Sequence, residues 1–270
     1  MSTIVVHGPS GALHVASMPA PHGASGSELP ALFVHGLVGH TGFWEHTLAH
    51  AARHRRAFAL DLRGHGRSAQ PADGDYSVEG FAADVAAVLD ALQLERVALV
   101  GHSFGAFVAL AVAAGAPARV ARLVLADPPG DFTKLPAEVR DGQLAPFVAA
   151  LEGDDWRRTI ELAFDEALTA GAPTTRDIVR RRLAATPRDA LLGVYRAMFR
   201  FDAVAALDAY LARPHITPRA ILAPANAWSY SLHVLRPALA ATVLPDVGHW
   251  LMLDAPTPFG WALDEALKER

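Results

Sequence analysis

Residues 97–114, VALVGHSFGAFVALAVAA, form the stretch that decides the fold. The apolar residues at its start are typical of a buried strand, and the small residues after the second glycine are typical of a helix. A serine on a tight turn between a strand and a helix needs small neighbours, because the backbone must bend there without clashes; Gly101 and Gly105 supply them. The pattern therefore predicts that Ser103 is a catalytic nucleophile, exposed at the carboxyl end of a sheet beside a helix N-terminus.

Apolar runs and helix-like segments alternate on both sides of this turn. Residues 3–17 predict two short strands in a hairpin, and further strand-like runs follow at 31–35, 57–61, 96–101 and 120–126. The segments between these runs predict helices at 42–53, 77–92 and 104–114. Such alternation requires parallel strand pairing, with right-handed crossovers that put helices on both faces. The sequence thus predicts an α/β fold built on a doubly wound sheet.

The alternation stops after residue 130. From Asp131 to about Arg213 the chain consists of helix-like pieces separated by prolines and glycines. We predict that residues 131–213 form a helical cap inserted over the sheet, and that residues 1–130 and 214–270 form one core domain. Two more strand-like runs, at 219–223 and 241–245, and a closing helix near 257–268 complete that core. With the hairpin, they make a mostly parallel sheet of eight strands.

The composition is that of a folded globular protein and excludes several classes of function. The residues are 51% hydrophobic and 19% charged, and the net charge of -4 lacks the basic footprint of a nucleic-acid-binding protein. There is no cysteine, which excludes a disulfide framework and a thiol nucleophile. The first residues lack the pattern of a signal peptide, and no run of about 18 apolar residues follows. We expect a cytoplasmic enzyme, monomer or homodimer, without membrane insertion.

Four further motifs accompany the serine turn in a fixed order. They are HGLVG at 35–39, DLRGHGRS at 61–68, LVLADP at 123–128 and GHW at 248–250. Together with the turn, they make the chain resemble the α/β-hydrolase fold family, of the serine hydrolase or esterase type with a helical cap. The resemblance covers nearly the whole chain, and it implies an oxyanion hole formed by the backbone N–H groups of Leu37 and Phe104. It also implies supporting roles for His102 and His65.

A serine hydroxyl is a weak nucleophile unless a base takes its proton, and imidazole has a suitable pKa. Among thirteen histidines, His249 is preferred, because it follows the last strand-like run on a short loop that ends above the nucleophile in this family. His46, His50 and His54 repeat every four residues, a spacing that can hold a metal on a helix, but no nearby carboxylate completes such a site. We therefore predict neither a metal nor a cofactor.

The acid that should orient His249 departs from the commonest pattern of the family. It usually follows the strand expected at 219–223, but the next residues, APANAWSYS, contain no Asp or Glu. Asp127 ends an earlier strand-like run, 24 residues after Ser103, at a position that some family members use. We predict that it accepts the imidazole N–H.

An aspartate at the end of this strand also has a simpler interpretation, as a cap of the turn before Pro128. Asn226 and Asp131 are weaker substitutes for the acid, and Asp246 is too close in sequence to His249 to reach behind its ring. The choice between a catalytic and a capping role for Asp127 therefore stays open at this point.

Large apolar side chains near the predicted site favour an apolar acyl or alcohol group in a small-molecule substrate. The predicted substrate contacts are His35, Trp44, Phe104, Phe132, Trp156 and Trp250. The sequence thus predicts a serine hydrolase that cleaves a carboxylic ester, or a related acyl bond, through an acyl-enzyme. Two alternatives stay open: a lactonase or carbon–carbon bond hydrolase with the same Ser103, Asp127 and His249, and a non-catalytic ligand-binding member of the fold.

Overall fold

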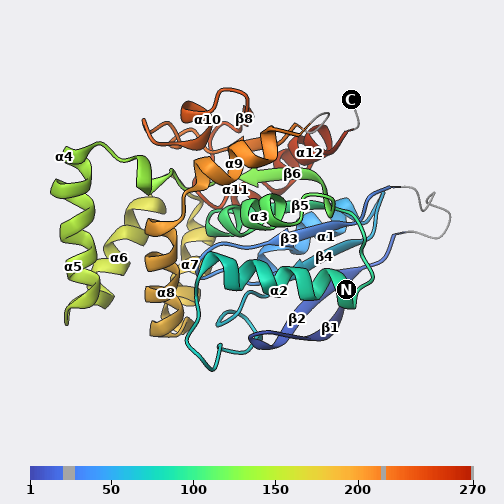
Figure 1. The fold of residues 1–270 in the computed structure, drawn as a ribbon, viewed down its shortest axis with the longest axis horizontal. Helices are drawn as coiled ribbons and strands as arrows, with labels where there is room; N and C mark the ends of the chain where they lie inside the picture. The colour runs from blue at the N-terminus through green and yellow to red at the C-terminus, as the bar shows by residue number, and fades with distance from the viewer. Residues whose placement is uncertain (21–27, 214–216, 269–270) are drawn as a thin grey trace.

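The computed structural model describes residues 1–20, 28–213 and 217–268. Eight strands form one sheet in the order β1-β2-β4-β3-β5-β6-β7-β8. The strands are β1 (Ser2–Gly8), β2 (Gly11–Met18), β3 (Ala31–Val34), β4 (Ala57–Leu60), β5 (Val97–His102), β6 (Val120–Ala126), β7 (Arg219–Leu222) and β8 (Ala240–Val243). The hairpin β1–β2 is antiparallel and joins β4 antiparallel, whereas the pairs from β4 to β8 are all parallel. The predicted α/β fold with a mostly parallel eight-stranded sheet is confirmed (Figure 1).

Helices cover both faces of the sheet, as the alternation of strands and helices requires. On one face α1 (Glu45–Ala51) packs against α12 (Pro256–Leu267), and on the other α2 (Val78–Ala91) and α9 (Ala203–Leu211) pack against α3 (Phe104–Gly115). Short helical turns join them: η1 (Thr41–Trp44), η2 (Phe132–Lys134), α10 (Leu232–Leu235) and α11 (Leu251–Asp254). Every residue of β3, β4 and β5 is buried between these layers, which explains why their sequences are uninterrupted apolar runs.

The segment predicted as a cap is helical. Its helices are α4 (Ala137–Val139), the π-helical turn η3 (Arg140–Leu144), α5 (Ala145–Glu152), α6 (Trp156–Ala167), α7 (Pro173–Ala185) and α8 (Arg188–Arg200). Figure 1 shows them gathered at the side of the sheet toward which the arrow of β6 points. The last helix of the segment, α9, differs, because it lies along α3 and its Tyr210 hydroxyl donates to the Val120 carbonyl at 3.1 Å. The division into core and cap at residues 131–213 stays a prediction.

The ends of some expected elements differ in detail from the structure. The single helix expected at 42–53 begins as η1 and continues as α1, and the closing helix is preceded by the short α11. The surface connection expected at 19–30 lies largely outside the described residues. No helix within the described part of the chain is long and apolar enough to cross a membrane.

Candidate active site

Ser103 lies on a sharp turn between β5 and α3. Its φ of 51° and ψ of -126° are strained for a residue with a side chain. A Cβ at Gly101 would lie 2.2 Å from the Gly105 carbonyl oxygen, and one at Gly105 would lie 2.4 Å from the Val34 oxygen, so neither position has room for a side chain. The predicted strand–turn–helix around Ser103 is confirmed, together with the reason for its two glycines.

Two hydrogen bonds join the three side chains that the sequence predicts as a triad. His249 Nε2 lies 2.9 Å from Ser103 Oγ, and His249 Nδ1 lies 2.6 Å from Asp127 Oδ2. Ser103 and Asp127 directly follow β5 and β6, neighbouring parallel strands whose carboxyl ends meet at one edge of the sheet. With a neutral imidazole, Nδ1–H donates to the carboxylate and the serine hydroxyl donates to Nε2. In the sequence, His249 lies 146 positions after Ser103 and 122 positions after Asp127, and the structure brings the three together.

The Asp127 carboxylate contacts the loop after β7 with one oxygen and the His249 imidazole with the other. Its Oδ1 accepts hydrogen bonds from the Ala223 N–H at 2.9 Å and from Asn226 Nδ2 at 3.1 Å, while its Oδ2 faces His249. The side chain is only 6% exposed, and its φ of 44° is held by an N–H bond to the Ile221 carbonyl. Among the described residues, the carboxylate thus holds the loop after β7 and not the turn before Pro128, while its other oxygen faces the imidazole.

Asn226 lies after β7, in the segment that lacks an acid, and contacts the Asp127 carboxylate. Sequence reasoning weighed Asn226 as a replacement for Asp127, but its amide contacts that carboxylate, not the imidazole. It also donates to the Pro128 carbonyl at 2.9 Å, and its own oxygen accepts a hydrogen bond from Ser231 at 2.8 Å. The other weighed substitute, Asp131, accepts bonds from Thr133 and from the Val204 N–H. Both residues shape the loops around the site.

The two amides predicted to form an oxyanion hole lie on either side of the serine. Phe104 is the first residue of α3, so its N–H has no partner inside the helix. Leu37 follows Gly36, where an added Cβ would lie only 3.1 Å from Ser103 Oγ. Within the described residues, neither of these N–H groups donates a hydrogen bond. Both amides are thus able to bind a negatively charged oxygen.

His35 fixes the peptide group that carries the Leu37 N–H. Its Nε2 accepts a bond from the Leu62 N–H at 3.0 Å, so Nδ1 carries the proton and donates to the Gly36 carbonyl at 2.7 Å. Burial holds the pKa of His35 well below its usual value, which keeps the ring neutral. Because a peptide is planar, anchoring the Gly36 carbonyl also orients the Leu37 N–H. His35, predicted as a substrate contact, has neither ring nitrogen available to a substrate.

His102 supports the loop of His249. Its Nε2–H donates to the His249 carbonyl at 2.8 Å, and the two rings lie 4.9 Å apart between centroids. Burial, followed by the nearby His249, lowers the pKa of His102 well below its usual value, so the ring stays a neutral donor. This contact agrees with the supporting role that the resemblance implies.

The remaining predicted substrate contacts fall into three environments. Trp44 and Phe104 are fully buried and pack in the core, against Phe33 and Phe81 respectively. Trp250 is also buried, but its ring lies 4.9 Å from that of His249. Phe132 and Trp156 are partly exposed on the helical segment. Of these aromatic side chains, that of Trp250 touches the triad.

Four aromatic residues of the helical segment, which the sequence does not single out as substrate contacts, form ring contacts. The Phe164 ring of α6 packs on Trp250 at 5.8 Å. Phe147, Tyr195 and Phe199 form a cluster with ring centroids 5.5 to 6.0 Å apart. Their helical spacing is also that of ordinary core residues, so the sequence offers no signal to distinguish them.

Metal binding was considered for the histidines of α1 and the residues after it. His50 Nε2 instead lies 2.8 Å from Asp264 of α12, and its Nδ1 faces Arg53. Across residues 1–20, 28–213 and 217–268, no group of three His, Asp or Glu side chains is arranged to hold a metal ion.

The fold is that of a known hydrolase family. Residues 30–180 match the model of the alpha/beta hydrolase fold, so the chain belongs to this family. It is 33% identical over 178 residues, 64% of its length, to 2-hydroxy-6-oxo-2,4-heptadienoate hydrolase of Pseudomonas putida, of which the match covers 61%. It is also 41% identical over 104 residues to 2-hydroxymuconate semialdehyde hydrolase of a Pseudomonas species, covering 37% of each chain. The match therefore spans less than two thirds of these relatives.

The enol-lactonase of Burkholderia xenovorans has a similar structure over the whole chain. The TM-score is 0.79, with 98% of this chain and 99% of that chain covered. The sequence identity of 17% makes this a likeness of fold.

Proposed function

We propose that this protein is a serine hydrolase that cleaves a carboxylic ester, or a related acyl bond, in a small and largely apolar substrate. The observation that carries the proposal is the hydrogen-bonded chain from Asp127 through His249 to Ser103, with distances of 2.6 and 2.9 Å. A hydroxyl becomes a useful nucleophile when an oriented imidazole accepts its proton. The two available amides of Leu37 and Phe104 supply the other requirement, which is a place for negative charge.

In the first half of the reaction, Ser103 Oγ attacks the carbonyl carbon while its proton passes to His249 Nε2. The carbonyl oxygen becomes an oxyanion and accepts hydrogen bonds from the N–H groups of Leu37 and Phe104. Asp127 stabilises the imidazolium through Nδ1–H. The imidazolium then gives its proton to the departing alkoxide, which leaves as an alcohol, and the acyl group stays on Ser103.

In the second half, water replaces the alcohol. His249 takes a proton from the water, whose oxygen attacks the acyl carbonyl, and the same amides bind the second oxyanion. When this intermediate collapses, the imidazolium returns its proton to Ser103 Oγ and the carboxylic acid leaves. No net proton is left on His249, so the triad is ready for the next substrate.

The side chains above the triad support an apolar substrate. Trp250 lies against His249, and Phe164 of α6 covers Trp250 in turn. Sites that bind small apolar molecules are typically lined by apolar side chains, with only a few polar groups. The apolar surroundings of His249 thus favour an apolar alcohol or acyl group beside the reacting carbonyl.

A second candidate is cleavage of a carbon–carbon bond or of a lactone by the same three side chains. The names of the relatives favour it, since two of them are hydrolases of dienoate or semialdehyde compounds and one structural neighbour is an enol-lactonase. A panel of nitrophenyl esters, lactones and vinylogous diketones separates these reactions. The class with the highest kcat/KM identifies the bond that the enzyme cleaves.

Labelling with a fluorophosphonate probe tests the proposal without knowledge of the substrate. We expect covalent labelling of the wild-type protein and its complete loss in Ser103→Ala, because the probe reacts with an activated serine. Ser229→Ala is the matched control, since Ser229 is exposed on the loop after β7, and it should label normally. A wild-type protein that fails to label, or a labelled Ser103→Ala variant, would contradict the proposal.

A further inference from the structure

A polar hollow of about 170 Å³ lies between the loop after β4 and the C-terminal end of α7. The loop contributes His65, Ser68 and Gln70, and the helical segment contributes Arg182 and Thr186. None of the triad residues lines it. A water molecule occupies about 30 Å³ in the liquid, so the hollow has room for a larger molecule.

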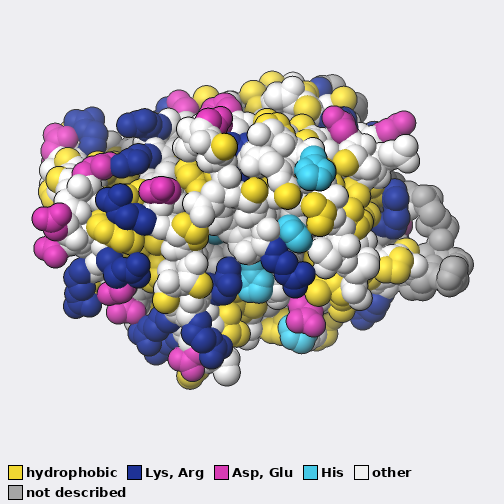
Figure 2. All heavy atoms as spheres, turned by 90° about the horizontal axis from the view of Figure 1, so that it is seen from below, with side chains coloured by type: hydrophobic (Ala, Val, Ile, Leu, Met, Phe, Trp, Pro, Cys, Tyr) yellow, Lys and Arg dark blue, Asp and Glu magenta, His cyan; other side chains and the backbone are white. Residues whose placement is uncertain are grey.

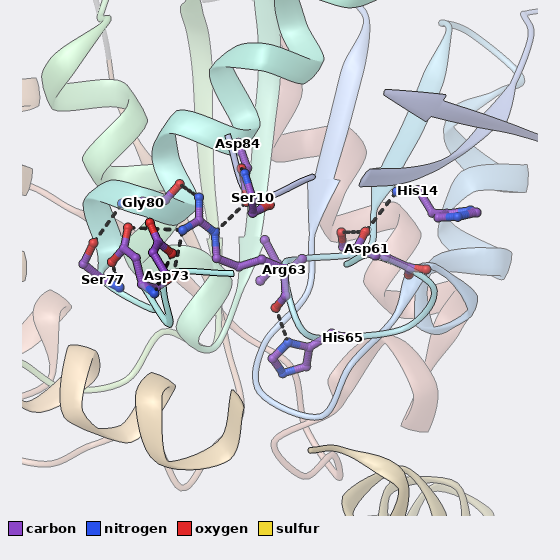
Figure 3. A network of polar contacts seen from close by, with 12 residues as sticks. Ser10, His14, Asp61, Arg63, His65, Asp73, Ser77, Gly80 and Asp84 are labelled. Carbon is purple, nitrogen blue, oxygen red and sulfur yellow. Dashed lines mark hydrogen bonds and ion pairs between the residues drawn. The ribbon is translucent and has the colours of Figure 1, made fainter. Parts of the chain in front are cut away.

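His65 lines this hollow and carries a buried hydrogen-bond acceptor. The residue is 3% exposed, and its Nδ1–H donates to the Arg63 carbonyl at 3.0 Å. The proton on Nδ1 leaves Nε2 as an acceptor, and this atom is buried without a donor among the described residues. Figure 3 shows the ring on the side of the loop away from the Arg63 guanidinium and its carboxylate partners. Burial lowers the pKa of His65 to about 4, so the ring remains neutral at neutral pH.

Arg182 lines the same hollow and forms no ion pair within the part of the chain that the structure describes. It lies in the last turn of α7, and its Nε is buried without an acceptor among the residues that the structure describes. Burial is the largest cause of the lowered pKa of His65 and of His40, and the Arg182 charge lowers the pKa of both further. The nearby carboxylate of Asp61 is already occupied by the N–H groups of Thr41 and Arg67.

We propose that this hollow binds a small oxyanion that also carries a hydroxyl group. Two oxygens of the anion accept hydrogen bonds from the Arg182 guanidinium, and the hydroxyl donates to His65 Nε2. Phosphate in its protonated forms, hydrogencarbonate and 2-hydroxycarboxylates share this chemistry. The bound anion would join α7 to the loop after β4, at a place distinct from the triad.

Phosphate and sulfate are the pair of probes that test the acceptor. They have the same shape, but at pH 7 only phosphate has a proton to donate to His65 Nε2, and a buried acceptor left unpaired weakens binding strongly. By calorimetry on the wild-type protein at matched ionic strength, we expect phosphate to bind at least about tenfold more tightly than sulfate. Glycolate and acetate form the organic pair, and comparing the two pairs distinguishes an inorganic ligand from an organic one. Equal binding within both pairs, or no binding of any probe, would overturn the proposal.

Substitution of the arginine tests the cation. Arg182→Gln should abolish the binding of the preferred anion, and Arg182→Lys should weaken it, because an ammonium cannot form two parallel bonds. Arg180→Gln is the matched control two residues earlier on α7, where the side chain is exposed and pairs with Asp165; it should bind as the wild type does. Retained binding in Arg182→Gln would also overturn the proposal. Calorimetry measures no turnover, so these outcomes are independent of whether Ser103 is catalytic.

Discussion

The edge of the sheet that carries Ser103 and Asp127 and the helices α4–α8 are built differently. At the edge, Ser103 and Asp127 hold strained backbone angles, and both are fixed by backbone hydrogen bonds to neighbouring strands. In the helical segment, ion pairs such as Arg196–Glu152 join side chains that are about half exposed. Figure 2 shows basic and acidic side chains mixed over the surface at the end of the molecule that these helices form.

This difference indicates which part sets the chemistry and which part can vary. A strained turn with glycine on both sides tolerates few sequences, so the groups that we propose to react are held by the backbone. An amphipathic helix tolerates many sequences provided that its apolar stripe is kept. We therefore expect substitutions at the edge to affect turnover strongly, and those on the helical surface to have small effects.

The largest expected effect is that of Asp127→Asn. The amide keeps the shape of the carboxylate, but it cannot accept the Nδ1–H of His249 and stabilise the imidazolium in the same way. We expect kcat to fall by about 10⁴-fold, which is the scale of loss when the acid of a serine triad becomes an amide. Initial rates on the best substrate of the panel, with circular dichroism as a check of folding, measure this effect.

Asp246→Asn is the matched control for this change. Asp246 lies three residues before His249 in sequence, is exposed, and has a φ of 56° that asparagine accepts readily. Its turnover should equal that of the wild type. If Asp127→Asn also retained near-normal turnover, Asp127 would have to be removed from the proposed triad.

The fold could be predicted from the sequence because its signals are local. Buried parallel strands require uninterrupted apolar runs, and those at 31–35, 57–61, 96–101 and 120–126 all correspond to strands of the sheet. The position of α9 could not be predicted in the same way. Its apolar residues predict that one face of the helix is buried, but not which element that face packs against. Only the structure shows it on α3, inside the core layer.

The same limit applies to the site. The motifs predicted Ser103, His249 and Asp127 as a triad, and the structure places the three side chains within hydrogen-bond distance. The sequence could not reveal that Asn226 holds the second oxygen of Asp127, because that contact joins residues 99 positions apart. Nor could it assign Trp44 to the core, because a tryptophan buried in the core and one that contacts a substrate cannot be distinguished in the sequence.

A second prediction compares a buried ion pair of the core with an exposed one on the helical segment. Arg63 binds Asp84 at 2.7 Å and also donates to the Gly80 carbonyl, and the two charged side chains are 3% and 0% exposed (Figure 3). Removing one partner leaves a buried charge unpaired, so Arg63→Gln should lower the free energy of unfolding by about 3–5 kcal/mol. Urea unfolding followed by fluorescence measures the change.

Arg196→Gln is the control on the helical surface. Both side chains of its ion pair with Glu152 are about half exposed, and water replaces a lost partner there. Its urea midpoint should be indistinguishable from that of the wild type. If Arg196→Gln lowered the free energy of unfolding as much as Arg63→Gln, the exposed ion pair of the helical segment would be as important for stability as the buried pair of the core, which would contradict this comparison.

The smallest effect expected at the edge is a dependence of stability on pH. Burial lowers the pKa of His65 from 6.5 to about 4. Between these two pH values, the unfolded chain therefore binds a proton at this residue and the folded chain does not. Stability is therefore complete above pH 6.5 and is lost as the pH falls toward 4, by about 2 kcal/mol at pH 5 from this residue. His65→Gln should reduce the difference in unfolding free energy between pH 7.5 and pH 5 by about that amount, whatever its stability at pH 7.5. His7→Gln, which removes an exposed histidine of β1, should retain the wild-type difference; an equal difference in all three proteins would show that the ring of His65 is not kept neutral by burial.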